Sequence, residues 1–221
     1  FTTNEISKKI LKNKIYSNDY IFNVGSPGVE LIHNTKFIKK ENLEKILDLK
    51  FKKKIFLITL HPATLDKSST KTQITNLLKA LENYQNDTSL IFTFPNEDEK
   101  NDIIINKINS FKKRSQNVKI FKSLGRIKYF SLLKISNIII GNSSSGIYEA
   151  PYLKIPTVNI GKRQKGRIML NSIFNADEKS STIIKKINAA LQFKKSKTKF
   201  FYDNRKSSNI ILKKIKKYLI K

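Results

Sequence analysis

The sequence predicts an α/β fold, in which a Rossmann-like, doubly wound parallel sheet is covered by helices on both faces. Two observations lead to this fold class. Short apolar runs alternate along the chain with segments of helical spacing, which is the pattern of βαβ units. The apolar runs are also nearly continuous, with little polar alternation, as expected of strands buried on both faces of a parallel sheet.

We expect about six strands, each a short apolar run that ends in a turn. They are residues 20–24, 55–60, 90–94, 118–121, 137–140 and 157–160. The run Ile138-Ile139-Ile140 has the composition of a fully buried strand. All these runs are far shorter than the ~18 apolar residues that span a bilayer, so we expect no membrane-crossing segment.

The segments between and after these strands have helical spacing. They are residues 70–84, 100–113, 127–133, a short helix from Gly146, 181–193 and 207–219. In the last segment the isoleucines and leucines share one face, the other face is rich in lysine, and Ser207 or Ser208 is placed to cap its start. This pattern is typical of an amphipathic helix packed on its own domain, and binding to a membrane surface is the alternative.

The charge balance is strongly basic, with 44 Lys and Arg against 17 Asp and Glu and a net charge of +27. Such a charge suits nucleic acid or an anionic surface. Only five of the basic residues are arginine, however, and the lysines are scattered along the whole chain. We therefore interpret them as a solvated surface and expect no nucleic-acid partner. The chain has no cysteine, which favours a reduced, cytoplasmic location.

Polar loops follow the expected strands, at the edge of a parallel sheet where ligands bind. They are Gly25-Ser26-Pro27-Gly28, His61-Pro62, Pro95-Asn96-Glu97-Asp98, Gly141-Asn142-Ser143-Ser144-Ser145-Gly146 and Gly161-Lys162-Arg163-Gln164-Lys165-Gly166-Arg167. Each loop is enriched in residues that bind anions or polar groups. Because the carboxyl ends of parallel strands lie at one edge of a sheet, we expect the five loops to converge there.

The serine-rich loop 141–146 has the composition of a phosphate site. It follows a buried run and precedes a helix, so its hydroxyls and backbone N–H groups lie at a helix N-terminus, where the dipole favours an anion. Glu149, one turn later, would repel phosphate but can accept hydrogen bonds from a ribose diol. A serine-rich turn that only caps a helix is the alternative.

Two of the five arginines fall in the loop 161–167. Arg163 and Arg167 offer bidentate donors for phosphate oxygens, and an exposed basic loop is the alternative. His61 stands at a strand tip before Pro62, which holds it extended. A ligand-binding role for His61 competes there with a structural one. His33, at the end of a short helix, is expected to be structural.

The order and spacing of these motifs resemble the hydrolysing UDP-N-acetylglucosamine 2-epimerases. The similar stretches are 24–28, 59–62, 141–151, 155–161 and 161–167. Related non-hydrolysing enzymes tend to have Asp-Ser-Gly-Gly in place of residues 142–145, and an acidic stretch in place of residues 163–167. The resemblance covers only the second half of the family's sequence, and the chain begins with Phe1 rather than Met. We therefore expect a fragment of a larger enzyme.

The resemblance implies two Rossmann-like domains that face a cleft, as in the GT-B glycosyltransferases. Residues 1–221 would form the C-terminal, nucleotide-sugar-binding domain, with about 1–20 and 205–221 as linker or crossover segments to a missing N-terminal domain. The residues carried over from the family are Gly25 and Asn96 for the base and phosphate pocket, Ser143 and Ser144 for phosphate oxygens, Glu149 for the ribose hydroxyls, and Arg163 and His61 for the diphosphate or its sugar-facing side. His61 is also the candidate catalytic residue.

The implied activity is removal of the C2 proton of a UDP-sugar, anti elimination of UDP from C1, and addition of water to the resulting glycal. The products would be UDP and a 2-epimer of the N-acetylmannosamine type. The family's acid–base carboxylates belong to the first domain, which this chain lacks, so we expect the chain alone to be inactive. No metal and no redox cofactor are implied.

The resemblance leaves the choice of substrate open. N-acetylglucosamine and diacetamido-bacillosamine are both candidate sugars, UDP and GDP are both candidate nucleotides, and the product would serve biosynthesis of the sialic or legionaminic acid type. We expect the full-length protein to be a homo-oligomer. Two functions from other classes are the alternatives. The donor-binding domain of a GT-B glycosyltransferase is disfavoured by the loop 163–167, and a basic nucleic-acid-binding module would need stacking aromatics or clustered arginines.

Overall fold

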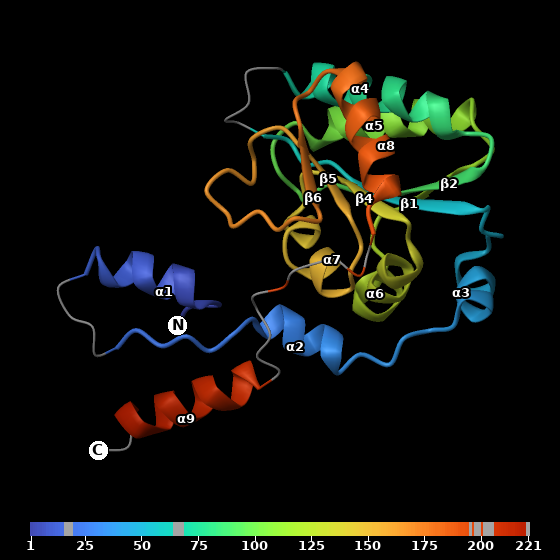
Figure 1. Cartoon of the computed structure of the whole chain (residues 1–221). Helices are drawn as coiled ribbons and strands as arrows, with labels where there is room; N and C mark the ends of the chain where they lie inside the picture. The colour runs from blue at the N-terminus through green and yellow to red at the C-terminus, as the bar shows by residue number, and fades with distance from the viewer. Residues whose placement is uncertain (16–19, 64–68, 195, 197–199, 201–205, 220–221) are drawn as a thin grey trace. The chain divides into compact units, whose positions relative to one another are not determined.

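The computed structural model describes residues 1–15, 20–63, 69–194, 196, 200 and 206–219. The chain divides into two compact units (Figure 1). The larger unit comprises Lys36–Lys199, and the smaller one joins Phe1–Thr35 to Phe200–Lys221. The sheet lies in the larger unit, which is described first.

The larger unit is built on a parallel sheet with the strand order β3-β2-β1-β4-β5-β6. The strands are β1 (Lys54–Thr59), β2 (Thr88–Thr93), β3 (Val118–Phe121), β4 (Ile138–Gly141), β5 (Thr157–Ile160) and β6 (Ile173–Ala176). Strand order reverses direction between β1 and β4, where Thr59 lies in register with Gly141. The predicted doubly wound fold is therefore confirmed, and its switch point lies between these two strands.

Helices α4 (Thr70–Leu81), α5 (Asn101–Lys113) and α8 (Ser180–Gln192) cover one face of the sheet, above it in Figure 1. All three were predicted within a few residues of these bounds. Their apolar sides meet strand residues such as Phe56 and Phe92 in one core. Burying a side chain of this size stabilises the fold by about 1.5–3 kcal/mol.

Helices α3 (Lys40–Leu47), α6 (Gly125–Ile135) and α7 (Glu149–Tyr152) cover the opposite face. Leu57 and Ile139, which are neighbours in register, point into this second core. Successive residues of a strand therefore enter different cores, which explains why the strands lack polar alternation. Helix α3 is an addition to the predicted helices.

Strand β6 was also not predicted from the sequence. It lies at the edge of the sheet beside β5, with Ile173 and Ala176 buried and Asn175 exposed. The Asn159 side chain of β5 donates a hydrogen bond to Asn175 Oδ1 at 2.8 Å. An edge strand with a solvated position lacks the continuous apolar run by which the inner strands are recognised.

The smaller unit contains α1 (Glu5–Lys12), α2 (Pro27–His33) and α9 (Ser207–Leu219). The prediction of a strand at residues 20–24 is wrong, because this segment makes a single parallel bridge with Thr2. The bridge consists of one hydrogen bond donated by the Thr2 N–H and one accepted by its carbonyl oxygen. Residues 20–24 are largely apolar, but pairing with a single residue cannot extend into a ladder of hydrogen bonds between strands.

Helix α9 begins at Ser207, as predicted, but its first turn is satisfied by an acidic side chain. The backbone N–H and the hydroxyl of Ser208 donate to the Glu30 carboxylate at 2.8 and 2.7 Å. A carboxylate at a helix N-terminus is favoured by the helix dipole. Segments 1–20 and 205–221 both contribute to this unit, and their role as links to a further domain stays a prediction.

Candidate functional site

The loops after β1, β2, β3 and β4 enclose a pocket of about 500 Å³ at the carboxyl edge of the sheet. Its lining residues lie within 59–61, 93–96, 122–130 and 143–149. The volume falls in the range of small-molecule sites, and the position beside the topological switch point is where open α/β sheets bind ligands. This pocket is the candidate site.

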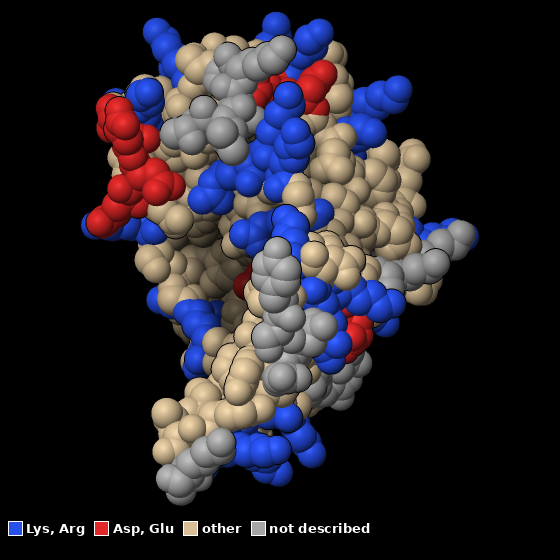
Figure 2. All heavy atoms as spheres, turned by 90° about the vertical axis from the view of Figure 1, so that its left-hand side faces the viewer, with Lys and Arg blue, Asp and Glu red and all other residues tan. Residues whose placement is uncertain are grey.

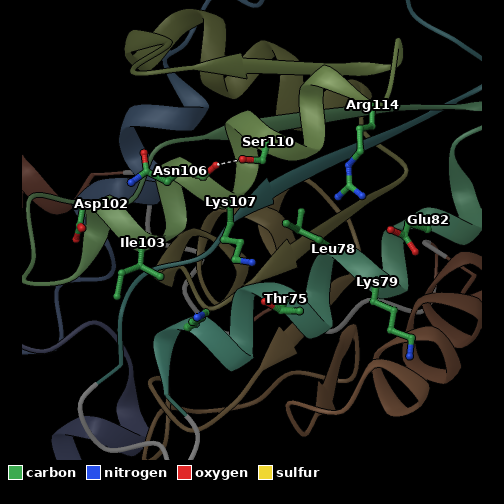
Figure 3. Close-up of a pocket in the computed structure, with 11 residues that line it drawn as sticks. Thr75, Leu78, Lys79, Glu82, Asp102, Ile103, Asn106, Lys107, Ser110 and Arg114 are labelled. Carbon is green, nitrogen blue, oxygen red and sulfur yellow. Dashed lines mark hydrogen bonds between the residues drawn. The ribbon is translucent and has the colours of Figure 1, made fainter.

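A larger hollow of about 630 Å³ lies between α4 and α5 (Figure 3). Leu78 and Ile103 contribute apolar surface to it, and Lys107 and Arg114 contribute cations. It is a groove of the helix layer, and the loops that follow the strands take no part in its lining. Ligands of this fold bind beyond the strand ends rather than on the helices, so we assign the site to the smaller pocket.

Gly141, the last residue of β4, allows a close approach to the end of β1. Its φ of 132° lies in the region that favours glycine, and a Cβ atom there would overlap the Thr59 carbonyl oxygen. The next residue, Asn142, then reaches His61. The His61 N–H donates to Asn142 Oδ1 at 2.7 Å, and Asn142 Nδ2 donates back to the His61 carbonyl at 2.9 Å. The loops after β1 and β4 are thus joined by two buried hydrogen bonds.

The loop after β5 is attached to the same asparagine. Gln164, which is buried, donates from Nε2 to the Asn142 carbonyl at 2.8 Å, and Arg163 donates to the same oxygen at 3.3 Å. The guanidinium of Arg163 also lies near enough to His61 to lower the pKa of that imidazole. Asn142 therefore holds three loops, and with them the positive charge of Arg163, in one arrangement.

His61 is held as a neutral hydrogen-bond donor. The Asn96 N–H donates to His61 Nδ1 at 3.0 Å, which leaves the imidazole proton on Nε2. Burial, followed by the charge of Arg163, lowers the pKa of His61 to about 4, against a smaller opposing effect of Asp98. At neutral pH the ring in the pocket wall can therefore donate from Nε2, while its Nδ1 is occupied and cannot act as a base.

The three serines of the β4 loop have different environments. The Ser143 hydroxyl accepts a hydrogen bond from the Ser145 N–H at 3.3 Å and caps the 3-10 helix Ser144–Gly146. Ser143 is partly exposed and Ser144 exposed at the pocket, whereas Ser145 is buried. The expected helix from Gly146 is split into this turn and the four-residue α7. Because so short a helix has a small dipole, hydroxyls, N–H groups and cations would carry anion binding here.

Glu149 brings a carboxylate into the pocket wall. The Ser145 hydroxyl and the residue's own N–H form hydrogen bonds to this carboxyl group, and Arg167 is close enough to favour its charge. Burial has a larger effect and raises the pKa of Glu149 above its ordinary value. Glu149 Oε2 is enclosed and has no hydrogen-bond partner among the described residues. An enclosed acceptor of this kind is suited to a hydroxyl donor on a ligand.

Five of the seven residues carried over from the sequence lie together. His61, Asn96, Ser143, Ser144 and Glu149 line the pocket. Asn96 contributes through its backbone N–H to His61, since its side chain is exposed.

The other two carried-over residues do not line the pocket. Arg163 is joined to it through the Asn142 carbonyl. Gly25 belongs to the smaller unit, where it precedes α2 with a φ of 80°, and its assignment to the base pocket stays a prediction. Arg167 donates to the Tyr148 hydroxyl and lies over the Tyr148 ring.

The loop after β3 was not predicted from the sequence as part of the site. Lys122, Ser123, Arg126 and Tyr129 line the pocket from this loop and the first turns of α6. The strand was predicted, so the rule that ligands gather at carboxyl strand ends would have included the loop. Gln164 gave no signal of its own, because only the fold shows that it is buried against Asn142.

Figure 2 shows Lys and Arg scattered over the face in view, among wide areas of other residues, with Asp and Glu in small separate groups, as expected of scattered charge. In the part of the chain that the structure describes, no helix is long and apolar enough to cross a bilayer. The described His, Asp and Glu residues also form no group of three or more that could hold a metal ion.

The sequence is similar to those of curated 2-epimerases. GDP/UDP-N,N'-diacetylbacillosamine 2-epimerase (hydrolyzing) of Campylobacter jejuni is 45% identical over 179 residues, which are 80% of this chain and 46% of the relative. UDP-N,N'-diacetylbacillosamine 2-epimerase (hydrolyzing) of Legionella pneumophila is 29% identical over 208 residues, which are 94% of this chain and 54% of the relative. The chain thus spans about half the length of the curated relatives it matches.

The fold is also found in a solved enzyme. The structure of Methanocaldococcus jannaschii UDP-GlcNAc 2-epimerase in complex with UDP-GlcNAc and UDP matches with a TM-score of 0.76 at 22% identity, covering 98% of this chain and 60% of that one. The family model for UDP-N-acetylglucosamine 2-epimerase matches residues 1–216. With almost the whole chain matched, this protein belongs to the UDP-N-acetylglucosamine 2-epimerase family.

Proposed function

We propose that this chain is the UDP-binding half of a hydrolysing 2-epimerase that acts on a UDP- or GDP-linked amino sugar. The observation that carries the proposal is the pocket at the switch point, which is lined by a neutral donor at His61, the hydroxyls of Ser143 and Ser144, and Glu149, whose enclosed oxygen Oε2 has no partner among the described residues. Donors suit a diphosphate, and an acceptor suits ribose hydroxyls.

The donors of this half stabilise the leaving group. When the bond between C1 and the diphosphate breaks, negative charge develops on the departing oxygen. His61 Nε2–H, the serine hydroxyls and the nearby charge of Arg163 are preorganised to receive that charge, because Asn142 and Asn96 already fix their loops. Such electrostatic stabilisation is commonly worth about 3–4 kcal/mol per donor in other enzymes.

The proton transfers must be supplied from elsewhere. Glu149 is the one carboxylate among the described residues that line the pocket, and it is already bonded to Ser145. Removal of the C2 proton needs a base within hydrogen-bond reach, and His61 has its Nδ1 occupied. We therefore assign the acid–base groups to the part of the enzyme that this chain lacks, and the chain alone is expected to be inactive.

The names of the relatives favour diacetamido-bacillosamine, which they call N,N'-diacetylbacillosamine, as the sugar. Two relatives are described as hydrolyzing 2-epimerases of its nucleotide-linked form. The released 2-epimer would serve amino-sugar biosynthesis of the sialic or legionaminic acid type. We place the full-length protein in the cytoplasm as a homo-oligomer, with no membrane or nucleic-acid partner. A GT-B glycosyltransferase domain, which shares the fold, remains the second candidate.

Calorimetry with UDP tests the binding claim. The 221-residue chain should bind UDP, and Ser144→Ala should weaken binding by a factor of about ten, since one hydrogen bond to a charged group is lost. Ser172→Ala is a matched control, because Ser172 is buried and lies outside the pocket lining. Absence of UDP binding, or duplex-DNA affinity that persists at high salt, would contradict the proposal.

A further inference from the structure

A chain of hydroxyl groups connects helix α6 to the pocket. The Tyr129 hydroxyl donates a hydrogen bond to Ser145 Oγ at 2.8 Å, and the Ser145 hydroxyl forms a hydrogen bond to the Glu149 carboxyl group. Burial raises the pKa of Tyr129, so its phenol keeps the proton that it donates. Ser145 accepts from the tyrosine and can therefore direct its own proton toward the carboxylate.

This chain of hydroxyl groups leaves one oxygen of the Glu149 carboxylate, enclosed in the pocket wall, without a partner among the described residues. Glu149 Oε2 has no partner among the described residues, so the bond from Ser145 goes to the other oxygen. A carboxylate oxygen can accept two hydrogen bonds, and the two vicinal hydroxyls of a ribose supply two donors. A 2′-deoxyribose supplies only one hydroxyl donor. The carboxylate oxygen therefore discriminates between the two sugars only if it is held in an orientation that accepts hydrogen bonds from both hydroxyls of a ribose.

Tyr129 provides that orientation from outside the loop. Ser145 and Glu149 lie in the same short segment, where the hydroxyl could otherwise rotate toward other acceptors. Tyr129 comes from α6, in a different part of the sequence, and also lines the pocket. Its bond fixes the serine hydroxyl, which in turn fixes the carboxylate.

We infer that Tyr129 is a positioning residue that holds the Glu149 carboxylate through the Ser145 hydroxyl and thereby gives the site its preference for ribonucleotides over 2′-deoxyribonucleotides. The inference rests on the proposed binding of a uridine diphosphate. It deepens that proposal by naming the feature of the nucleotide that helix α6 helps to select.

The test is calorimetry of UDP and 2′-deoxy-UDP with the wild-type chain and Tyr129→Phe. The wild type should bind UDP about tenfold to a hundredfold more tightly than 2′-deoxy-UDP, as expected for one hydrogen bond to a carboxylate. Tyr129→Phe should reduce this ratio to about threefold or less, mainly by weakening UDP. Tyr84→Phe is the matched control, because it removes another phenol hydrogen bond, to Asn188 at 2.8 Å, in the core on the opposite face of the sheet.

Ser145→Ala breaks the same chain at its second link and should lower the ratio to the same extent, with no further loss in the double variant. It also keeps the test decisive if Tyr129→Phe fails to fold, which circular dichroism would show. A Tyr129→Phe variant that retains the wild-type ratio, or a wild type that does not distinguish the two nucleotides, overturns the inference while UDP binding stands. A wild type that binds neither nucleotide overturns the proposed function as well.

Discussion

The two sides of the pocket have opposite polarity. The donor side consists of His61, which lines the pocket, and of Asn142, Arg163 and Gln164, which lie outside the lining, hold its loops together and add positive charge. The acceptor side consists of Tyr129, Ser145 and Glu149, and it presents a carboxylate oxygen that lacks a partner among the described residues. A ligand that fits both sides has an anionic part and a hydroxyl-bearing part, as a nucleoside diphosphate does. The loop after β4 serves both sides, with Asn142 on one and Ser145 on the other.

The largest expected effect comes from the residue on which both sides depend. Gly141→Ala places a Cβ atom against the Thr59 carbonyl oxygen at a φ that disfavours side chains. We expect the free energy of unfolding to fall by roughly 3–5 kcal/mol in urea denaturation, because the clash involves backbone. Gly166→Ala is the control, since its φ is also positive but nothing lies within 4 Å of the added atom. It should lose about 1 kcal/mol, and equal losses in the two variants would contradict the close approach.

A smaller effect is expected on UDP binding, and it should differ between the hydrogen-bonded Arg163 and the exposed Lys165 of the loop after β5. Arg163→Ala should weaken UDP binding by about tenfold to a hundredfold, because it removes a charge held beside His61 by the Asn142 carbonyl. Lys165→Ala removes an exposed charge from the same loop and should change the dissociation constant by less than about threefold. If both variants bound UDP equally, general basicity rather than the donor side would explain the affinity.

The donor side should destabilise the fold in acid. His61 has a folded pKa of about 4, below its ordinary 6.5, so the unfolded chain takes up a proton first as pH falls. The wild type should therefore lose stability as pH falls from 6.5 toward 4, and His61→Gln should lack this part of the pH dependence. Denaturation curves between pH 4 and 7 would show it. Parallel profiles for the two proteins would contradict a buried, neutral His61.

The acceptor side should show the opposite dependence, of smaller size. Burial raises the pKa of Glu149 above its ordinary 4.5, so the folded chain holds the proton more tightly than the unfolded chain. The stability that this gives is fully present below pH 4.5 and is lost as pH rises through the folded pKa. Glu149→Gln should remove that loss while weakening UDP binding at neutral pH. A variant that binds UDP as the wild type does would exclude Glu149 from the site.

The sequence predicted the larger unit better than the smaller one. The inner strands are recognisable because each is apolar on both faces, and the loops after them could be placed at one edge because parallel strands share it. Strand β6 was not predicted, and residues 20–24 were wrongly predicted as a strand. In both cases strand pairing depends on a neighbouring segment that local composition does not reveal.

The same limit applies to the site. His61, Ser143 and Glu149 were named because motifs mark them, and their convergence follows from the topology. Asn142, Gln164 and Tyr129 hold those residues through contacts between loops that are distant in sequence. Neither the residue types nor their spacing in the sequence indicate such contacts. The residues that would touch a ligand were therefore easier to predict than the residues that position them.

We propose that this chain binds the nucleotide of a hydrolysing epimerase but lacks its acid–base groups. The most direct test is to incubate the 221-residue chain and the full-length protein separately with UDP-linked N-acetylglucosamine and diacetamido-bacillosamine, and to identify the products by chromatography and NMR. We predict that the full-length protein releases free UDP together with a 2-epimerised amino sugar, and that the chain alone releases none. Release of UDP by the chain alone, or an epimer that is still linked to UDP, would contradict the account.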